Sequence, residues 1–169
     1  MMNLDIDQTL RESVSEALQM LADAPADFAT DGATLPENGS PLITATVYLT
    51  GADRAALTLY FSNKDAQGLF EKFAGYAEED PVLLGDAVGE LANLVAGGVK
   101  RIFAEGVDNP PYDHLSLPRI SEGQPSTANA GAGTSTPFSF SSGNIFSAHG
   151  SLTLGVPVEE SAADGKVMS

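Results

Sequence analysis

One long amphipathic segment, from Asp80 to Phe103, constrains the fold more than any other part of this sequence. It reads DPVLLGDAVGELANLVAGGVKRIF. Asp80 is a favourable N-cap residue, and Pro81 fits the first helical position, because the N–H that proline lacks would have no intrahelical acceptor there. Acidic residues before the segment and basic residues near its end complement the helix dipole. The sequence therefore predicts one long helix beginning at Pro81.

The spacing of the apolar residues divides this predicted helix into two faces. At about 100° per residue, one stripe is apolar and is expected to be buried; it comprises Val88, Leu91, Ala92, Val95, Val99, Ile102 and Phe103. The opposite face carries Asp86, Glu90, Asn93, Gly97, Lys100 and Arg101. Glu90 and Asn93 stand at i and i+3, so their side chains project from the same patch. A flat patch with one carboxylate and one amide could admit the surface of another protein.

The residues around this pair resemble a known family. The pattern D-A-x-G-E-L-x-N-x-x-A-G-G-x-K, from Asp86 to Lys100, is similar to the helix that bears E-x-x-N in the CheC/CheX/FliY family of chemotaxis phosphatases. The likeness extends over about Leu4 to Phe103. A single E-x-x-N is present, which resembles CheX more than CheC.

Periodicity predicts the elements that precede this helix. Apolar residues at helical spacing predict a first helix over about Asp5 to Leu21, and the residues from Ala24 to Pro41 are typical of a loop. Alternating apolar residues in Ile43–Thr50 and Leu57–Phe61 predict a hairpin. Ser62 with Asp65 resembles a helix cap, so a short helix is expected to follow, with Phe73 on its apolar stripe.

The C-terminal third predicts further strands. His114 to Ile120 is compatible with a strand that bends at Pro118. The Gly, Ala, Ser and Thr residues over about 121–142 predict a flexible loop. Phe138–Phe146 and Ser151–Val158 predict a second hairpin that turns at His149-Gly150. The expected fold class is α+β, with helices packed on an antiparallel or mixed sheet. The resemblance assigns residues 1–160 to a single CheX-like domain and leaves 161–169 as a disordered tail.

The composition excludes several classes of function. A formal net charge of −15 leaves few basic residues for phosphate contacts, which argues against nucleic acid as a partner. The absence of cysteine excludes disulfides and thiolate metal sites. His114 and His149 are far apart in sequence, so no metal site is predicted. The N-terminal residues do not read as a signal peptide, no membrane span is expected, and the expected location is cytoplasmic.

The resemblance implies a phosphatase that hydrolyses the aspartyl-phosphate of a CheY-like response regulator. By match to the family motif, Asn93 would hold the attacking water and Glu90 would pair with the partner's active-site lysine, which makes both of them candidate catalytic residues. Asp86, Gly97 and Lys100 are candidate partner-binding residues. The protein would need no cofactor of its own, because the phosphorylated partner supplies Mg²⁺. A homodimer formed through the sheets is also implied.

Two functions are alternatives to the phosphatase. A non-catalytic CheX-like docking module would bind a response regulator or a flagellar switch component through the same helix without dephosphorylating it. A small-ligand binding domain would instead require a concave apolar pocket. Turnover with excess phosphorylated partner separates the first of these from the phosphatase.

Overall fold

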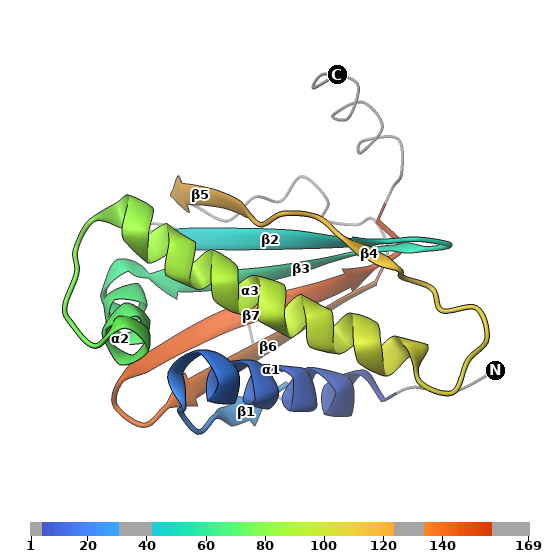
Figure 1. Cartoon of the computed structure of the whole chain (residues 1–169), viewed down its shortest axis with the longest axis horizontal. Coiled ribbons are helices and arrows are strands. Elements are labelled where there is room, and N and C mark those ends of the chain that lie inside the picture. The colour runs from blue at the N-terminus through green and yellow to red at the C-terminus, as the bar shows by residue number, and fades with distance from the viewer. Residues whose placement is uncertain (1–4, 31–41, 124–133, 157–169) are drawn as a thin grey trace, which may run out of the picture.

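A seven-stranded antiparallel sheet with helices on one face forms the computed structural model of this protein (Figure 1). The structure describes residues 5–30, 42–123 and 134–156. The helices are α1 (Ile6–Ala22), α2 (Asn63–Ala74) and α3 (Pro81–Ala104). The strands are β1 (Asp27–Ala29), β2 (Leu42–Thr50), β3 (Arg54–Ser62), β4 (His114–Leu115), β5 (Arg119–Gly123), β6 (Thr134–Ser142) and β7 (Phe146–Leu154).

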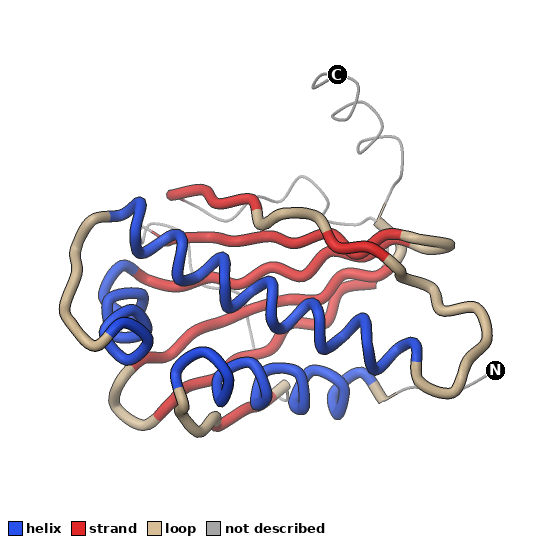
Figure 2. Tube along the Cα trace, viewed as in Figure 1, coloured by secondary structure: helices blue, strands red, loops and turns tan. Residues whose placement is uncertain are grey.

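The strand order places the predicted first hairpin in the middle of the sheet. The order is β1-β6-β7-β3-β2-β4, and β5 also pairs with β2. Figure 2 shows α1, α2 and α3 on the same side of this sheet, with α3 crossing it diagonally. The α+β prediction is confirmed.

The helix starts follow the capping residues in the sequence. The Ser62 side chain accepts a hydrogen bond from Asp65 N at 3.0 Å, and the Asp80 side chain accepts one from Val82 N at 2.9 Å. These contacts satisfy amide groups that have no acceptor within the first turn of a helix. Gly75, with φ of 89°, ends α2 in the left-handed region. The predictions for both helices are confirmed at these ends.

Burial of α3 follows its predicted stripe. All seven residues of that stripe are buried, at 8% exposure or less. On α2 the stripe prediction is wrong at one position, because Phe73 is 44% exposed. Its ring packs edge to face against Phe70 at 6.3 Å near the end of the helix, instead of entering the core.

The second hairpin turns at a different place from the prediction. It joins β6 to β7 around Gly143, which has φ of +53°. Residues 134–142 are therefore a strand. The flexible loop expected over 121–142 is wrong for these residues, whereas the strand predicted over Phe138–Phe146 is present as far as Ser142. His149 and Gly150 lie inside β7, so the predicted turn there is wrong. Gly150 is required for packing, because a Cβ at this position would lie 2.4 Å from Phe138 Cζ.

Two other differences arise from long-range pairing. β1 forms within the predicted Ala24–Pro41 loop because it pairs with β6, which lies more than a hundred residues away in sequence. The predicted strand from His114 to Ile120 is present as two short strands, β4 and β5, separated at Pro118. The remainder of both predicted loops, at 31–41 and 124–133, and the tail at 161–169 lie outside the described residues.

Hydropathy alone would allow α3 to span a membrane. It is the one helix among the described residues whose length and composition pass that test. Most of its apolar side chains are buried against the sheet and the other helices. The hydropathy of α3 is accounted for by its place in the core.

Two buried tyrosines predict a loss of stability at alkaline pH. Burial raises the pKa of Tyr60, partly offset by a Ser151 hydrogen bond, and burial with the negative charge of Asp53 raises the pKa of Tyr112. The unfolded chain therefore loses these protons first, at its ordinary pKa of about 10. We expect their contribution to the free energy of unfolding to be full below about pH 10 and to fall as pH rises through the folded pKa values.

Urea unfolding between pH 8 and 11 measures this effect. Replacing both tyrosines (Tyr60→Phe and Tyr112→Phe) should flatten the alkaline decline relative to wild type. An equally steep decline in the double variant would assign the effect to other groups.

Candidate functional site

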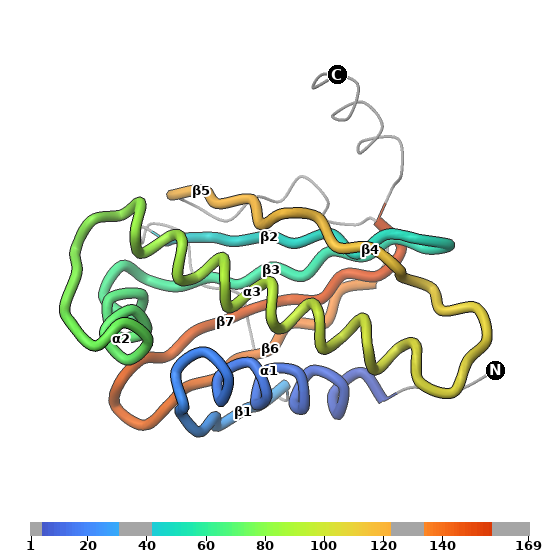
Figure 3. Tube along the Cα trace, viewed as in Figure 1, coloured from blue at the N-terminus to red at the C-terminus, as the bar shows by residue number. Residues whose placement is uncertain are grey.

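The exposed face of α3 carries all five residues singled out from the sequence. Asp86 and Glu90 are exposed, and Asn93, Gly97 and Lys100 are partly exposed. Figure 3 shows α3 crossing in front of the sheet, with α1 below it. Asp86, Glu90 and Asn93 fall within two turns of one helix, so they form one patch, which we call the α3 patch together with Gly97 and Lys100.

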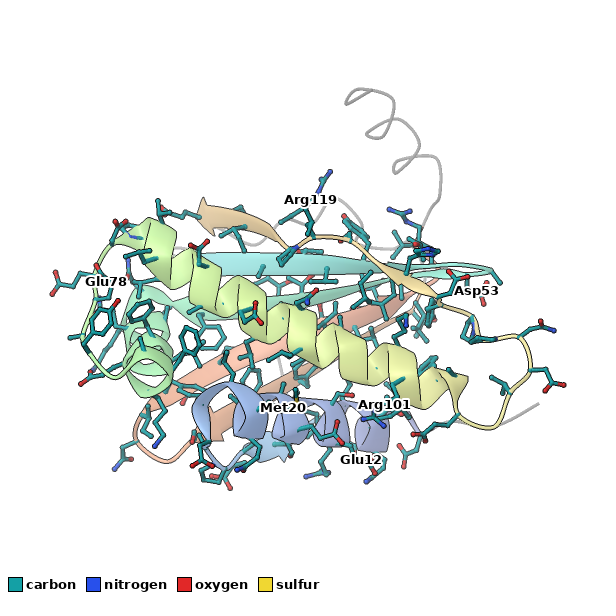
Figure 4. All side chains as sticks on the ribbon, in the orientation of Figure 1. Glu12, Met20, Asp53, Glu78, Arg101 and Arg119 are labelled. Atoms are coloured by element: carbon teal, nitrogen blue, oxygen red, sulfur yellow. The ribbon has the colours of Figure 1, made fainter. Side chains whose placement is uncertain are left out.

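The polar side chains of the α3 patch lack interaction partners within the described residues. The side chains of Asp86, Glu90, Asn93 and Lys100 have no hydrogen-bond or ion-pair partner among the residues the structure describes. Arg101 differs, since it binds Glu16 at 2.6 Å and Glu105 at 3.1 Å. In Figure 4 the Arg101 side chain lies between α3 and α1. The carboxylate and the amide are therefore available to a partner.

Two flanking elements hold α3 in place. On one flank α1 packs so closely that a Cβ at Gly98 would lie 2.9 Å from Ser13 Oγ. On the other flank runs the segment Leu115–Ile120, which leads from the end of β4 into the start of β5 and which we call the strap. Neither of these close approaches was predicted from the sequence. The glycines of α3 outside the patch were the signal that could have indicated them.

Metal ligation is not supported in the described part of the chain. No group of three or more His, Asp and Glu side chains there could hold a metal ion. His114 Nδ1 lies 2.7 Å from Asp113 Oδ1 at the surface, while His149 lies in β7. The two histidines are therefore not brought together.

A shallow hollow lies away from the α3 patch. Its volume is about 370 Å³, and its lining includes Asp27, Ser139 and His149. Ser139 alternates along β6 with Phe138 and Phe140, which are buried in the core beneath the helices, and His149 is paired with Ser139 across the strands. The hollow therefore opens on the sheet face opposite to α3. Its lining combines serine and aspartate residues with Phe28, Phe140 and Ala148, so it is a mixed polar and apolar hollow.

Several solved structures have a similar fold. CheX from Vibrio vulnificus has a TM-score of 0.70 and 22% identity, over 89% of this chain and 97% of that one. A chain of the CheX–CheY–BeF₃–Mg²⁺ complex from Borrelia burgdorferi has a TM-score of 0.69 and 14% identity, over 90% of this chain and 99% of that one. FliY from Thermotoga maritima has a TM-score of 0.62 and 15% identity, over 91% and 92% of the two chains. The chain has the CheX fold.

The CheX fold confirms, at the level of architecture, the resemblance noted in the segment from Asp86 to Lys100. The match extends over almost the whole length of the solved structures. The CheX fold therefore includes the C-terminal strands, which were predicted least accurately from the sequence. No protein-family model and no curated protein matches the sequence. In this version of the CheX fold, the helix that bears E-x-x-N is α3.

Proposed function

We propose that this protein hydrolyses the aspartyl-phosphate of a CheY-like response regulator, with Glu90 and Asn93 acting on the partner. The observation that carries this proposal is the pair itself. An exposed carboxylate and a partly exposed amide stand three residues apart on α3, without partners in the described residues. The fold adds support, because one structure with the same fold is a complex of CheX with CheY, BeF₃ and Mg²⁺.

Asn93 is proposed to position the attacking water. Hydrolysis of an acyl phosphate needs a water molecule in line with the breaking P–O bond and little covalent chemistry from the catalyst. A side-chain amide can accept a hydrogen bond from that water through its oxygen and donate one through its nitrogen, and it does not titrate near neutral pH. The receiver would supply the phosphorylated aspartate, a lysine and Mg²⁺. Holding the water in place removes part of the entropic barrier.

Glu90 is proposed to set the docking register. Its carboxylate would pair with the lysine of the receiver, one helical turn from Asn93. Asp86 and Lys100 would lie towards the two ends of the same contact, and Gly97 would leave room for close approach. Lys100 would also supply local attraction for an acidic receiver site, since Arg101 is engaged by Glu16 and Glu105. We place this activity in the cytoplasm and include a homodimer in the proposal.

The proposal is tested by the loss of acyl phosphate from a phosphorylated CheY-type receiver. We expect acceleration over the receiver alone when this protein is substoichiometric, because a catalyst turns over. Binding without acceleration would support the docking-module function instead. Neither binding nor acceleration with a panel of receivers would overturn the proposal.

Replacing Glu90 by alanine should raise the KM for phosphorylated receiver more than it lowers kcat. We expect a rise of about five- to tenfold at low salt, because an exposed charge pair contributes mainly to orientation and association. The difference should shrink as ionic strength increases and screens the pair. Steady-state kinetics at two salt concentrations measure it.

Glu12→Ala is the matched control for Glu90→Ala. Glu12 is an exposed carboxylate on α1, and its side chain points away from α3 (Figure 4). Its removal changes the net charge equally and should leave KM unchanged. A KM for Glu90→Ala equal to that of wild type at every salt concentration would remove Glu90 from the proposed contact.

A further inference from the structure

The strap runs beside α3 over two turns of the helix. At one end, a Cβ at Gly97 would lie 3.9 Å from Leu115 Cδ1. At the other end, a Cβ at Gly89 would lie 3.3 Å from Pro118 Cβ. In Figure 1 the chain between β4 and β5 follows β2 along this flank of α3. The strap is therefore antiparallel to the helix.

This register brings the middle of the strap to the level of Asn93. Asn93 lies one turn after Gly89 and one turn before Gly97. Ser116 and Leu117 are the two strap residues between the contacts at those glycines. The side chain of Leu117 is 85% exposed. The strap thus carries a large exposed apolar side chain at about the level of the amide that is proposed to position the water.

The middle of the strap is firmly attached. Ser116 N donates a hydrogen bond to Tyr48 O at 2.9 Å, and Tyr48 N donates one to Ser116 Oγ at 2.9 Å. The Ser116 hydroxyl also donates to Leu117 O at 2.9 Å. Leu117 is therefore exposed even though the segment that carries it is held to β2 by hydrogen bonds.

Two glycines of α3 allow the strap to pack close to the helix. A Cβ at Gly85 would lie 2.8 Å from Ile120 Cγ2, and one at Gly89 would lie 2.9 Å from Ile120 Cδ1. Real Cβ atoms do not approach so closely, so a side chain at either position would shift Ile120, and at Gly89 it would also crowd Pro118 Cβ at 3.3 Å. Glycine in a helix interior costs about 1 kcal/mol relative to alanine, and this close contact accounts for it.

The exposed side chains around the strap form an apolar margin to the α3 patch. Ile120 is 41% exposed, and Val82, one turn before Gly85 on α3, is 70% exposed. The basic side chain of Arg119 does not join them, because it points away from α3 (Figure 4) and its guanidinium lies 6.0 Å from the Tyr48 ring centre. Protein-binding surfaces combine an apolar part with a polar rim, and the exposed apolar side chains of the strap beside the polar α3 patch supply both.

We propose that the strap is a second contact element for the receiver domain, with Leu117 as its apolar anchor and Gly85 and Gly89 holding it in register with Asn93. This inference rests on the proposed function. A protein surface that brings an aspartyl-phosphate to Asn93 would also reach the strap, because Leu117 is exposed at about the same level along α3. The occupant is therefore a folded receiver domain, the partner in the proposed function.

Leu117 variants test the contact. The dissociation constant is measured with a receiver loaded with BeF₃ and Mg²⁺, and KM and kcat with phosphorylated receiver. We expect Leu117→Ala and Leu117→Asp to raise the dissociation constant and KM by about tenfold and by more than tenfold, respectively, with kcat unchanged. Because Leu117 is highly exposed, the thermal midpoint should not change. Ile145→Ala, which removes an exposed apolar side chain in the β6–β7 turn, should bind like wild type.

A pair of substitutions, one adding a methyl group and one removing a methyl group, tests how the strap packs against α3. Gly89→Ala adds one methyl group that meets Ile120 Cδ1, and we expect it to raise KM by about fivefold. Ile120→Val removes that Cδ1 atom, so the double variant should regain most of the affinity. Gly98→Ala is the matched control. Its Cβ also meets a side chain at 2.9 Å, that of Ser13 on the α1 flank; it should lower stability without raising KM.

The outcomes separate this inference from the function on which it rests. Wild-type protein that binds and turns over the receiver, with Leu117 and Gly89 variants that do the same, would overturn the strap contact and leave the phosphatase proposal standing. Wild-type protein that shows neither binding nor acceleration would overturn both.

Discussion

Asn93→Ala should lose at least about 100-fold of the acceleration of receiver dephosphorylation while the complex with the receiver persists. A loss of this size corresponds to about 2.7 kcal/mol of transition-state stabilisation, which is reasonable for one group that orients the attacking water. The side chain is partly exposed and has no partner within the described residues, so its removal should leave the fold intact. We therefore expect kcat to fall and the dissociation constant to stay within about twofold of wild type.

Asn93→Gln makes the test more specific. It retains the amide but moves it by one methylene group, so a positioning role predicts a large loss in this variant as well. Asn144→Ala is the control, because Asn144 is an exposed asparagine in the β6–β7 turn, remote from α3. Wild-type turnover by Asn93→Ala would remove Asn93 from the mechanism. Loss of binding in that variant would instead assign Asn93 to docking.

Gly150→Ala should have the largest effect on folding. The added Cβ would lie 2.4 Å from Phe138 Cζ and 2.9 Å from Thr58 O, which belongs to the neighbouring strand β3. The Phe138 ring cannot easily yield, since it also stacks with Phe28 at 5.6 Å and Phe140 at 6.1 Å. We expect the free energy of unfolding to fall by about 3 kcal/mol, the upper end of the usual range for overpacked cores.

Urea unfolding of Gly150→Ala measures this loss, with Gly97→Ala as the control. A Cβ at Gly97 would meet its nearest neighbour at 3.9 Å, an ordinary contact, and alanine favours the helix. Gly97→Ala should therefore be as stable as wild type or slightly more so. Truncating the opposing ring (Phe138→Leu) in the Gly150→Ala background should recover part of the loss. Wild-type stability of Gly150→Ala alone would contradict the packing described for β6 and β7.

Local signals predicted the helices and the first hairpin well. The N-caps Ser62 and Asp80, the alternation in β2 and β3, and the stripe of α3 each depend on residues close in sequence. The second hairpin was misplaced because the dipeptide His149-Gly150 resembles a turn when read locally. Gly150 in fact serves a contact with Phe138 on the paired strand, which only the cross-strand register reveals.

The same distinction between local signals and long-range contacts applies to the candidate site. The spacing of Glu90 and Asn93 predicted one patch, because both side chains belong to a single helix. The strap could not be predicted, because it depends on β5 pairing with β2 and on Ile120 reaching Gly85 and Gly89. The glycines indicated a close approach without identifying the neighbour. Such tertiary contacts are difficult to predict from the spacing of residue types in a single sequence.

The support of α3 on both flanks has a thermodynamic consequence for association. Glu90 and Asn93 come from adjacent turns of a helix that is packed against the core, so their relative positions exist before any partner arrives. Binding should then immobilise a few side chains and should not require a loop to become ordered, which keeps the entropic cost small. We expect the observed rate of complex formation to rise linearly with receiver concentration, as for rigid-body docking, without a plateau set by a slow rearrangement of this protein.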